Sequence, residues 1–239
     1  MGVACLLLCT VPAAAQDERT VTSPNGQIQF RLLIAQPDPG ALFELGYQVI
    51  YRGKLLLDTS FLGFDIHNQE PILGANLGLL SSHTGSGLGY HSLVAEYMQN
   101  GSLGRRLNVE ARVYNDGLAF RFIIPKSLPL DEILINDEYT EFSFPEALNP
   151  KAPLALPFVT EQPGVGWLAI TEVPTPGYPR MSLVRTEPKT LATHLDRLPS
   201  DPQLAVDTHT PLTASWRVIL IGPSKEQVMQ SKFVDRLNP

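Results

Sequence analysis

The chain has 239 residues, of which 44% are hydrophobic and 18% are charged, so it can bury a core and is not compositionally disordered. Its formal net charge is −6, and its 18 Lys and Arg residues are scattered instead of forming a basic stripe. This distribution argues against nucleic acid and against an anionic membrane surface as partners. The length suits one large all-β domain or two small ones.

The segment 1–15 predicts a secretory signal peptide. A short apolar run leads to Ala13-Ala14-Ala15, a small-residue cleavage pattern directly before Gln16. The run is too short to span a bilayer, and charged residues follow it at once. A buried strand is the alternative, and no Lys or Arg precedes the run, which is unusual for a signal. We therefore expect a secreted protein whose mature chain begins at Gln16.

Both cysteines of the chain, Cys5 and Cys9, lie inside this leader. Leu8 is too large for lipoprotein processing at Cys9, and the apolar run before Cys5 is too short. The mature chain then contains no cysteine, which excludes a disulfide framework and a cysteine-based zinc site. Its stability has to come from its core.

Most of the remaining sequence alternates apolar and polar residues between turn signals, which is typical of half-buried antiparallel strands. The clearest example is a hairpin around Asn115-Asp116-Gly117, a strong turn signal. Strands are predicted within residues 26–34, 43–57, 105–125, 138–144 and 215–222, and the second of these ranges is predicted to hold two short strands around an Arg52-Gly53 turn. We therefore expect an all-β fold and not the strand–helix alternation of an α/β protein.

Helical signals are sparse, and two segments have the composition of loops. The best helix signal lies in residues 223–233, where Ser224 can cap the helix and Gln227 occupies the capping-box position. The glycine-rich segment 83–89 and the proline-rich segment 144–166 are expected to be loops. The first loosely resembles a phosphate-binding loop, but no strand–loop–helix unit surrounds it.

The histidines do not form a metal-binding pattern. They are spread along the chain at His67, His83, His91, His194 and His209. No pair has the spacing of metal ligands, so each is expected on the surface or in a loop.

Three carboxylates, Asp137, Glu138 and Glu141, lie beside one predicted strand. Two acids at a suitable separation can perform glycosidic hydrolysis, and a solvated strand face is the simpler interpretation. Glu172 is a fourth candidate, because it ends an apolar strand in front of a turn rich in proline and glycine. A carboxylate of this kind can bind Ca²⁺, but Ca²⁺ needs about six oxygen ligands, so one glutamate is not a site.

The aromatic residues offer little evidence for a sugar-stacking platform. Trp167 and Trp216 lie in strand-like sequence and are expected in the core. Tyr178 lies in a Pro-Gly-Tyr-Pro turn and is the better candidate for a surface aromatic.

Several segments together resemble glycoside hydrolase family 97. They are "VTSPNGQIQFRL", "YRGKLLLDTSFLGFDI", "GRRLNVEARVYNDGLAFRFIIP", "DEYTEFSFP", "GWLAITEVPTPGYPRMSL" and "TPLTASWRVILIG", in the family's order. The hairpin and the "WRVILIG" strand are the most specific parts. The resemblance covers about residues 20–239.

The resemblance implies an all-β fold over residues 16–239: a mostly antiparallel β-supersandwich of the galactose mutarotase type with few short helices. Family members are secreted or periplasmic exo-acting α-glycosidases in which this domain precedes a catalytic barrel. The end of the chain, near 230–239, resembles the start of the linker to that barrel. Because the family's catalytic acid and base or nucleophile lie in the barrel, we expect no catalytic residue here. The chain as it stands is expected to be a non-catalytic, carbohydrate-binding accessory domain that packs on the barrel.

The resemblance also gives Glu172 a role. In the family, a glutamate at this strand end binds a Ca²⁺ shared with the barrel, so calcium is expected only in the full-length enzyme. The next family residues commonly follow the pattern "A-x-L-x-DYPGM", and this chain has "VPTPGYPRM". Gly177 replaces the acidic residue, and Pro174 and Pro176 stiffen the turn. The partner carbohydrate is expected to be an α-glucoside or an α-galactoside.

Two alternatives stay open at the level of sequence. A free-standing carbohydrate-binding module would need an exposed aromatic platform. An aldose-epimerase-like enzyme would need a histidine paired with a carboxylate, and no histidine lies in a recognisable motif for it. The choice between α-glucosides and α-galactosides belongs to the barrel.

Overall fold

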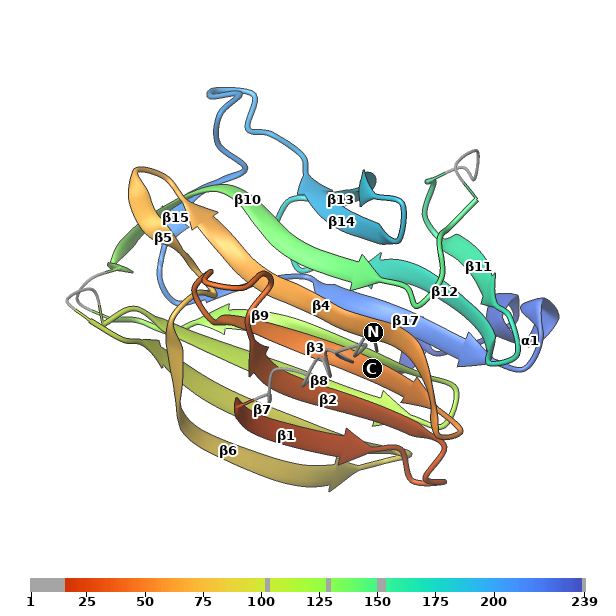
Figure 1. The fold of residues 1–239 in the computed structure, drawn as a ribbon. Helices are drawn as coiled ribbons and strands as arrows, with labels where there is room; N and C mark the ends of the chain where they lie inside the picture. Colours follow the sequence, from red (N-terminus) through yellow and green to blue (C-terminus); the bar gives the residue numbers. More distant parts are fainter. Residues whose placement is uncertain (1–15, 102–103, 128–129, 150–153, 238–239) are drawn as a thin grey trace, which may run out of the picture.

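The computed structural model describes residues 16–101, 104–127, 130–149 and 154–237, and the predicted signal peptide lies outside the described residues. The described chain forms two antiparallel sheets that pack as a sandwich, with a short α-helix and a short 3₁₀-helix (Figure 1). The prediction of an all-β sandwich is confirmed. Neither of these helices has the length and hydropathy that a membrane crossing requires.

The larger sheet has nine strands. They are β1 (Gln16–Thr22), β2 (Ile28–Ala35), β3 (Glu44–Tyr51), β4 (Lys54–Ile66), β5 (Gln69–Leu73), β10 (Glu132–Ser143), β13 (Met181–Glu187), β14 (Thr190–Leu195) and β15 (Val206–His209). Their order is β1-β2-β3-β4-β10-β14-β13, with β15 beside β10 and β5 beside β4.

The smaller sheet has eight strands. They are β6 (Leu77–Gly87), β7 (Tyr90–Gln99), β8 (Arg106–Tyr114), β9 (Gly117–Ile124), β11 (Phe158–Gln162), β12 (Gly166–Val173), β16 (Leu212–Thr213) and β17 (Trp216–Gly222). Their order is β11-β12-β17-β9-β8-β7-β6, with β16 beside β9.

The predicted hairpins are present. Arg52 and Gly53 join β3 to β4 with φ angles of 51° and 78°. Positive φ at both central residues matches the twist of the flanking strands. Asn115 and Asp116 join β8 to β9 as expected.

The prediction that segments 83–89 and 144–166 are loops is partly wrong. Within residues 83–89, strand β6 continues to Gly87 and pairs with β7, with Ser86 opposite His91. The polar side chains of this segment suit an edge strand that is exposed on both faces, so composition alone resembled a loop. The segment 144–166 contains β11, which pairs with β12 along its full length.

An aromatic cluster joins the two sheets inside the sandwich. Phe30 and Tyr47 come from β2 and β3 of the larger sheet, and Phe120 comes from β9 of the smaller one. The Phe120 ring centroid lies 5.5 Å from that of Phe30 and 4.9 Å from that of Tyr47. All three side chains are fully buried, so this contact is part of the main core.

Strand β17 is buried on both faces, although its sequence suggested a half-buried strand. Its second face is covered by α1 (Lys225–Met229) and η2 (Val234–Arg236), through Val228, Phe233 and Leu237. Ser224 caps α1 by accepting from the Gln227 N–H at 3.3 Å, which confirms the predicted helix start. The stretch expected to begin a linker near 230 therefore packs against the sandwich up to Leu237.

Phe120→Ala is expected to lower the free energy of unfolding by about 3–5 kcal/mol, because it leaves a cavity where the two sheets meet. Leu88→Ala is the matched control, since Leu88 is 98% exposed at the tip of the β6–β7 hairpin. Its effect should stay within about 0.5 kcal/mol. Urea unfolding of both variants measures the difference, and similar losses would contradict this packing.

Candidate functional site

Glu172 lies inside the sandwich, opposite an arginine. It stands near the end of β12, and the β12–β17 register places Arg217 directly across from it. Ile170 and Ile219, each two positions away on its strand, belong to the main core, so both charged side chains point inward. The Arg217 side chain is fully buried, and that of Glu172 is 1% exposed.

A β-bulge in the other sheet brings a second glutamate to the same place. The pairing of β10 with β4 gains one extra residue at Asn136, between Ile135 and Asp137. The bulge shifts the alternation of β10, so that Ile135 faces the core before it and Glu138 faces the core after it. Glu138 is therefore fully buried.

Arg217 bridges the two glutamates across the sandwich. Its Nε and Nη2 donate to Oε1 and Oε2 of Glu138 at 2.7 and 2.6 Å, and its Nη1 donates to Oε2 of Glu172 at 3.0 Å. Burial alone would lower the pKa of Arg217, but the neighbouring Glu138, with smaller contributions from Tyr178 and Glu172, raises it above its ordinary value. The arginine therefore stays charged and forms ion pairs with β10 of the larger sheet and β12 of the smaller sheet.

Tyr178 completes the surroundings of Glu138. Its hydroxyl donates to Oε2 of Glu138 at 2.6 Å, and the Thr140 hydroxyl donates to Oε1 at the same distance. Burial and the adjacent Glu138 raise the pKa of Tyr178 well above its ordinary value, so the phenol stays a neutral donor. The expectation of a surface Tyr178 is wrong, because the turn, with Gly177 at φ 81°, directs the ring into the core.

Both oxygens of Glu172 are occupied. Oε1 accepts from Nε of Arg180, whose side chain is 61% exposed. Oε2 accepts from Nη1 of Arg217 and from the backbone N–H of Met181 at 3.3 Å. In the described part of the chain, no three His, Cys, Asp or Glu side chains come together as metal ligands do. The residues present do not fit a calcium ion, and the calcium assignment of Glu172 stays a prediction.

The candidate carboxylates near Glu138 do not form a hydrolytic pair. Glu141 lies three residues from Glu138 and so faces the opposite side of the sheet. Its Oε2 accepts from the Phe61 N–H at 3.0 Å, and burial raises its pKa. The Cα atoms of Asp137 and Glu141 lie about 13 Å apart on an extended strand. Their carboxylates bind different neighbours, Phe61 for Glu141 and His194 for Asp137. The expected solvated strand face is wrong for Asp137 and Glu138, which are both buried.

Asp137 instead binds a histidine that sequence analysis left unpaired. Its Oδ2 lies 2.7 Å from Nδ1 of His194 and 2.9 Å from Nη2 of Arg197. Its Oδ1 accepts from the Leu195 N–H at 3.0 Å. The His194 side chain is 44% exposed, so the ring is partly open to solvent. Only the tertiary pairing of β10 with β14 brings the two residues together.

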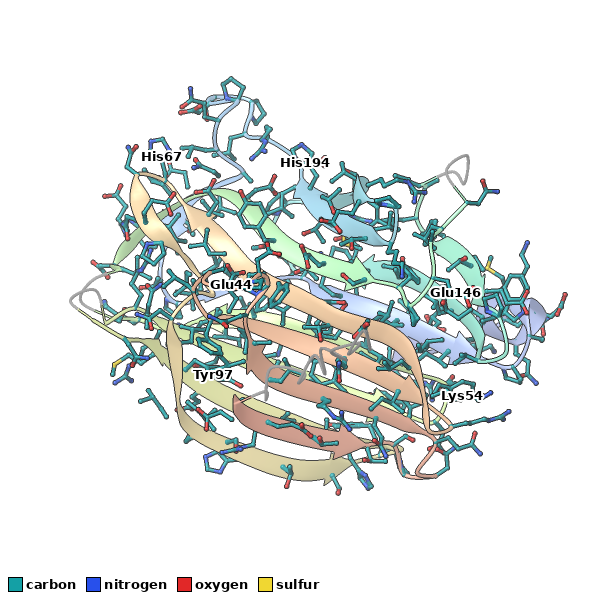
Figure 2. All side chains as sticks on the ribbon, in the orientation of Figure 1. Glu44, Lys54, His67, Tyr97, Glu146 and His194 are labelled. Carbon is teal, nitrogen blue, oxygen red and sulfur yellow. The ribbon has the colours of Figure 1, made fainter. Side chains whose placement is uncertain are left out.

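Asn136 and Asp137 gather two histidines at one end of the larger sheet. Nδ1 of His67 lies 2.9 Å from Oδ1 of Asn136, one residue before the Asp137–His194 pair. Figure 2 shows His67 and His194 at the same end of the molecule. The bulge in β10 thus organises polar groups on both of its sides.

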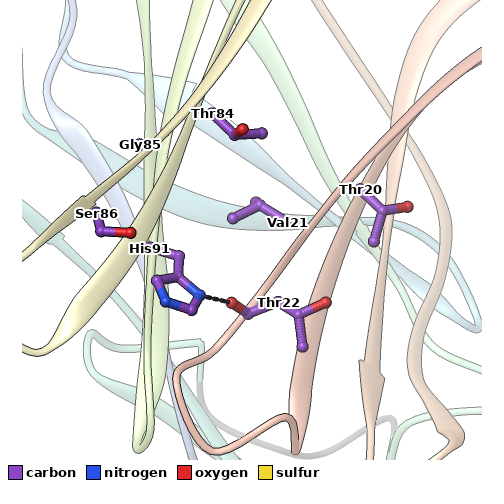
Figure 3. A pocket seen from close by; sticks show the side chains of 7 residues that line it. All are labelled: Thr20, Val21, Thr22, Thr84, Gly85, Ser86 and His91. Carbon is purple, nitrogen blue, oxygen red and sulfur yellow. Dashed lines mark hydrogen bonds between the residues drawn. The ribbon is translucent and has the colours of Figure 1, made fainter.

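A polar hollow of about 310 Å³ lies between β1 and the β6–β7 hairpin (Figure 3). It is lined by Thr20, Val21, Thr22, Thr84, Gly85, Ser86 and His91. Nδ1 of His91 is bonded to the Thr22 carbonyl oxygen at 2.7 Å. Neither Lys nor Arg lines this hollow, so the glycine-rich segment lacks the charge of a phosphate site.

The two tryptophans are placed as expected. Trp216 is 1% exposed, and the guanidinium groups of Arg121 and Arg112 lie 4.3 and 4.8 Å from its ring centroid. Trp167 is partly buried and packs against the smaller apolar cluster that contains Trp216, Val218 and Phe233. Trp216 therefore offers no free stacking face of the kind that sugar-binding modules use.

Solved structures with a similar fold include glycosidases. An enzyme of glycoside hydrolase family 97 from Pseudoalteromonas sp. matches with a TM-score of 0.80 and 19% identity, over 92% of this chain and 38% of that chain. A β-arabinopyranosidase matches with a TM-score of 0.65 and 18% identity, over 87% of this chain and 40% of that chain. The fold is therefore a β-sandwich of the kind found in these enzymes.

Sequence comparison identifies the family. The sequence model described as Glycosyl-hydrolase 97 N-terminal matches residues 21–150 and 147–239, so the chain belongs to this family. A retaining alpha-galactosidase from Bacteroides thetaiotaomicron is 25% identical over 159 residues, which is 62% of this chain and 22% of the relative. The chain thus spans only a small part of the length of this relative.

Arg217→Met is expected to lower the free energy of unfolding by about 3–5 kcal/mol, because it leaves two buried carboxylates without their shared cation. Arg236→Met is the control, since Arg236 forms an exposed ion pair with Asp116, and should cost at most about 1 kcal/mol. Denaturant unfolding followed by tryptophan fluorescence compares them. An Arg217→Met loss no larger than the control's would show that the buried cluster contributes little.

Proposed function

We propose that the chain is the non-catalytic N-terminal accessory domain of a secreted, exo-acting α-glycosidase. The observation that carries the proposal is the family match over residues 21–150 and 147–239. The coverage of the relatives supports it, since the chain corresponds to 38% of the solved family 97 enzyme and 22% of the curated α-galactosidase. Secretion rests on the signal-like segment 1–15.

The chemistry of the buried carboxylates supports a non-catalytic role. Glycoside hydrolysis uses one carboxyl group as a proton donor and a second as base or nucleophile. Glu138 and Glu172 are each bound by at least one guanidinium group, and Asp137 is bound by Arg197 and His194. Carboxylates held in this way have their oxygens occupied by other protein groups and are not free to contact a glycosidic bond.

The proposed partners are a catalytic domain and an α-linked sugar. Two of the similar solved structures are family 97 enzymes in complex with acarbose and with panose. We infer that this domain packs against the catalytic domain and walls part of a pocket for an α-glucoside or α-galactoside. Calcium is no part of the proposal, because the Glu172 carboxylate is occupied by arginines in this chain.

The purified chain is expected to release no nitrophenol from aryl α-glucosides or aryl α-galactosides, because its candidate carboxylates Asp137, Glu138 and Glu172 are all engaged by other protein groups. Glu172→Ala serves as the matched control for contaminating activity. Turnover above that of the control would overturn the proposal. Titration with acarbose by calorimetry measures any sugar affinity that the isolated domain retains, and we expect weak binding.

One observation favours a second candidate, an aldose-epimerase-like activity. Interconversion of sugar anomers needs a base that removes the proton of the C1 hydroxyl while the bond from C1 to the ring oxygen breaks and that oxygen takes up a proton, from water or an acid; the ring then closes on the other face. A histidine oriented by a carboxylate can act as the base. His194 is held by Asp137 and is partly open to solvent. A stand-alone binding module is less favoured, since Tyr139 is the one exposed aromatic side chain among the described residues.

Polarimetry of α-D-glucose tests this candidate. If it holds, the chain accelerates mutarotation above the buffer rate, and His194→Ala returns the rate to that of buffer. His209→Ala is the control, because His209 is an exposed histidine on β15. Acceleration that survives His194→Ala, or no acceleration at all, would exclude the candidate.

A further inference from the structure

Arg180 stands where it can replace a metal ion. Its Nε donates to Oε1 of Glu172, the carboxylate oxygen that Arg217 leaves free. This chain has Tyr-Pro-Arg-Met at residues 178–181, so Arg180 lies at the end of the turn that follows β12.

The charges around Glu172 balance without a metal. Glu138 and Glu172 contribute two negative charges, and Arg217 and Arg180 contribute two positive charges, all linked through ion pairs. A calcium ion at Glu172 would add two positive charges beside two guanidinium groups and would need about six oxygen ligands. Arg180 and Arg217 instead supply hydrogen-bond donors to Glu172, whereas a calcium ion needs oxygen ligands.

The same contacts fix the turn that follows β12. The Glu172 carboxylate accepts from Arg180 and from the Met181 N–H, which both lie at the far end of the turn. At the near end, the Thr175 N–H donates to the Ser215 hydroxyl at 3.0 Å, and the Thr175 hydroxyl donates to the Ala214 carbonyl at 3.1 Å. Glu172, before the turn, is therefore bonded to Arg180 and Met181 at the end of the turn, and these contacts fix the turn's conformation.

We propose that Arg180 is the permanent cation partner of Glu172, so that this glutamate positions the 174–180 turn instead of binding calcium. Arg180 thus acts as a positioning residue through Glu172. This role depends only on contacts within the described chain, so its test is independent of whether the chain works in a glycosidase.

A double-mutant cycle tests the pairing. Arg180→Ala is expected to lower the Tm of the purified chain by a few degrees, and to change it by much less when Glu172→Gln is already present. Arg106→Ala, an exposed arginine on β8 in the same sheet as Glu172, should have the same small effect in both backgrounds. Equal losses from Arg180→Ala in the two backgrounds would overturn the proposal.

A charge-retaining variant covers the case in which Glu172→Gln fails to fold. Arg180→Lys is expected to recover part of the Tm that Arg180→Ala loses, because it keeps a cation beside the carboxylate. Identical losses for the lysine and alanine variants would show that the charge of Arg180 is irrelevant and would also overturn the proposal.

Calcium gives the second readout. The Tm of the unmodified chain should be the same in millimolar calcium chloride as in magnesium chloride. A calcium-specific rise in Tm that disappears in Glu172→Gln would assign the metal to Glu172 and refute the role of Arg180. A rise that persists in Glu172→Gln belongs to another site and agrees with the proposal.

Discussion

The fully buried guanidinium group of Arg217 joins the two sheets through ion pairs. It donates two hydrogen bonds to Glu138 on the larger sheet and one to Glu172 on the smaller sheet. Transferring such charges out of water is costly, so the cluster stabilises the fold only when every member is in place. The aromatic core holds the sheets together without such a requirement, whereas the ion cluster demands one particular alignment of three strands.

Two local irregularities make this alignment possible. The extra residue in β10 reverses the direction of its side chains and sends Glu138 inward. The turn after β12 then places the Tyr178 hydroxyl on Glu138 and the Arg180 guanidinium on Glu172. A one-residue slip of any of these strands would leave a buried charge without its partner, so the cluster also disfavours incorrect strand registers.

The sequence predicted the parts that depend on local patterns. Alternation, the turn at Arg52-Gly53 and the Ser224 cap depend on neighbours within a few positions, and all three are confirmed. It failed where distant residues decide the environment. The Asp137–His194 pair has no local signal in the sequence, because it depends on the pairing of distant strands. The inward direction of Glu138 depends on a bulge, and that of Tyr178 depends on its buried partner Glu138. Resemblance to a family drew attention to Glu172, but its arginine partners emerged only from the fold.

The residues that pack over β17 limit how far the domain can be truncated at its C-terminus. Val228, Phe233 and Leu237 lie over the strand that carries Arg217. A protein trimmed after Gly222 would expose Trp216 and its apolar neighbours and would become prone to self-association. Expression of this domain in isolation, or its transfer onto another enzyme, therefore has to keep the sequence through Leu237, beyond the last strand.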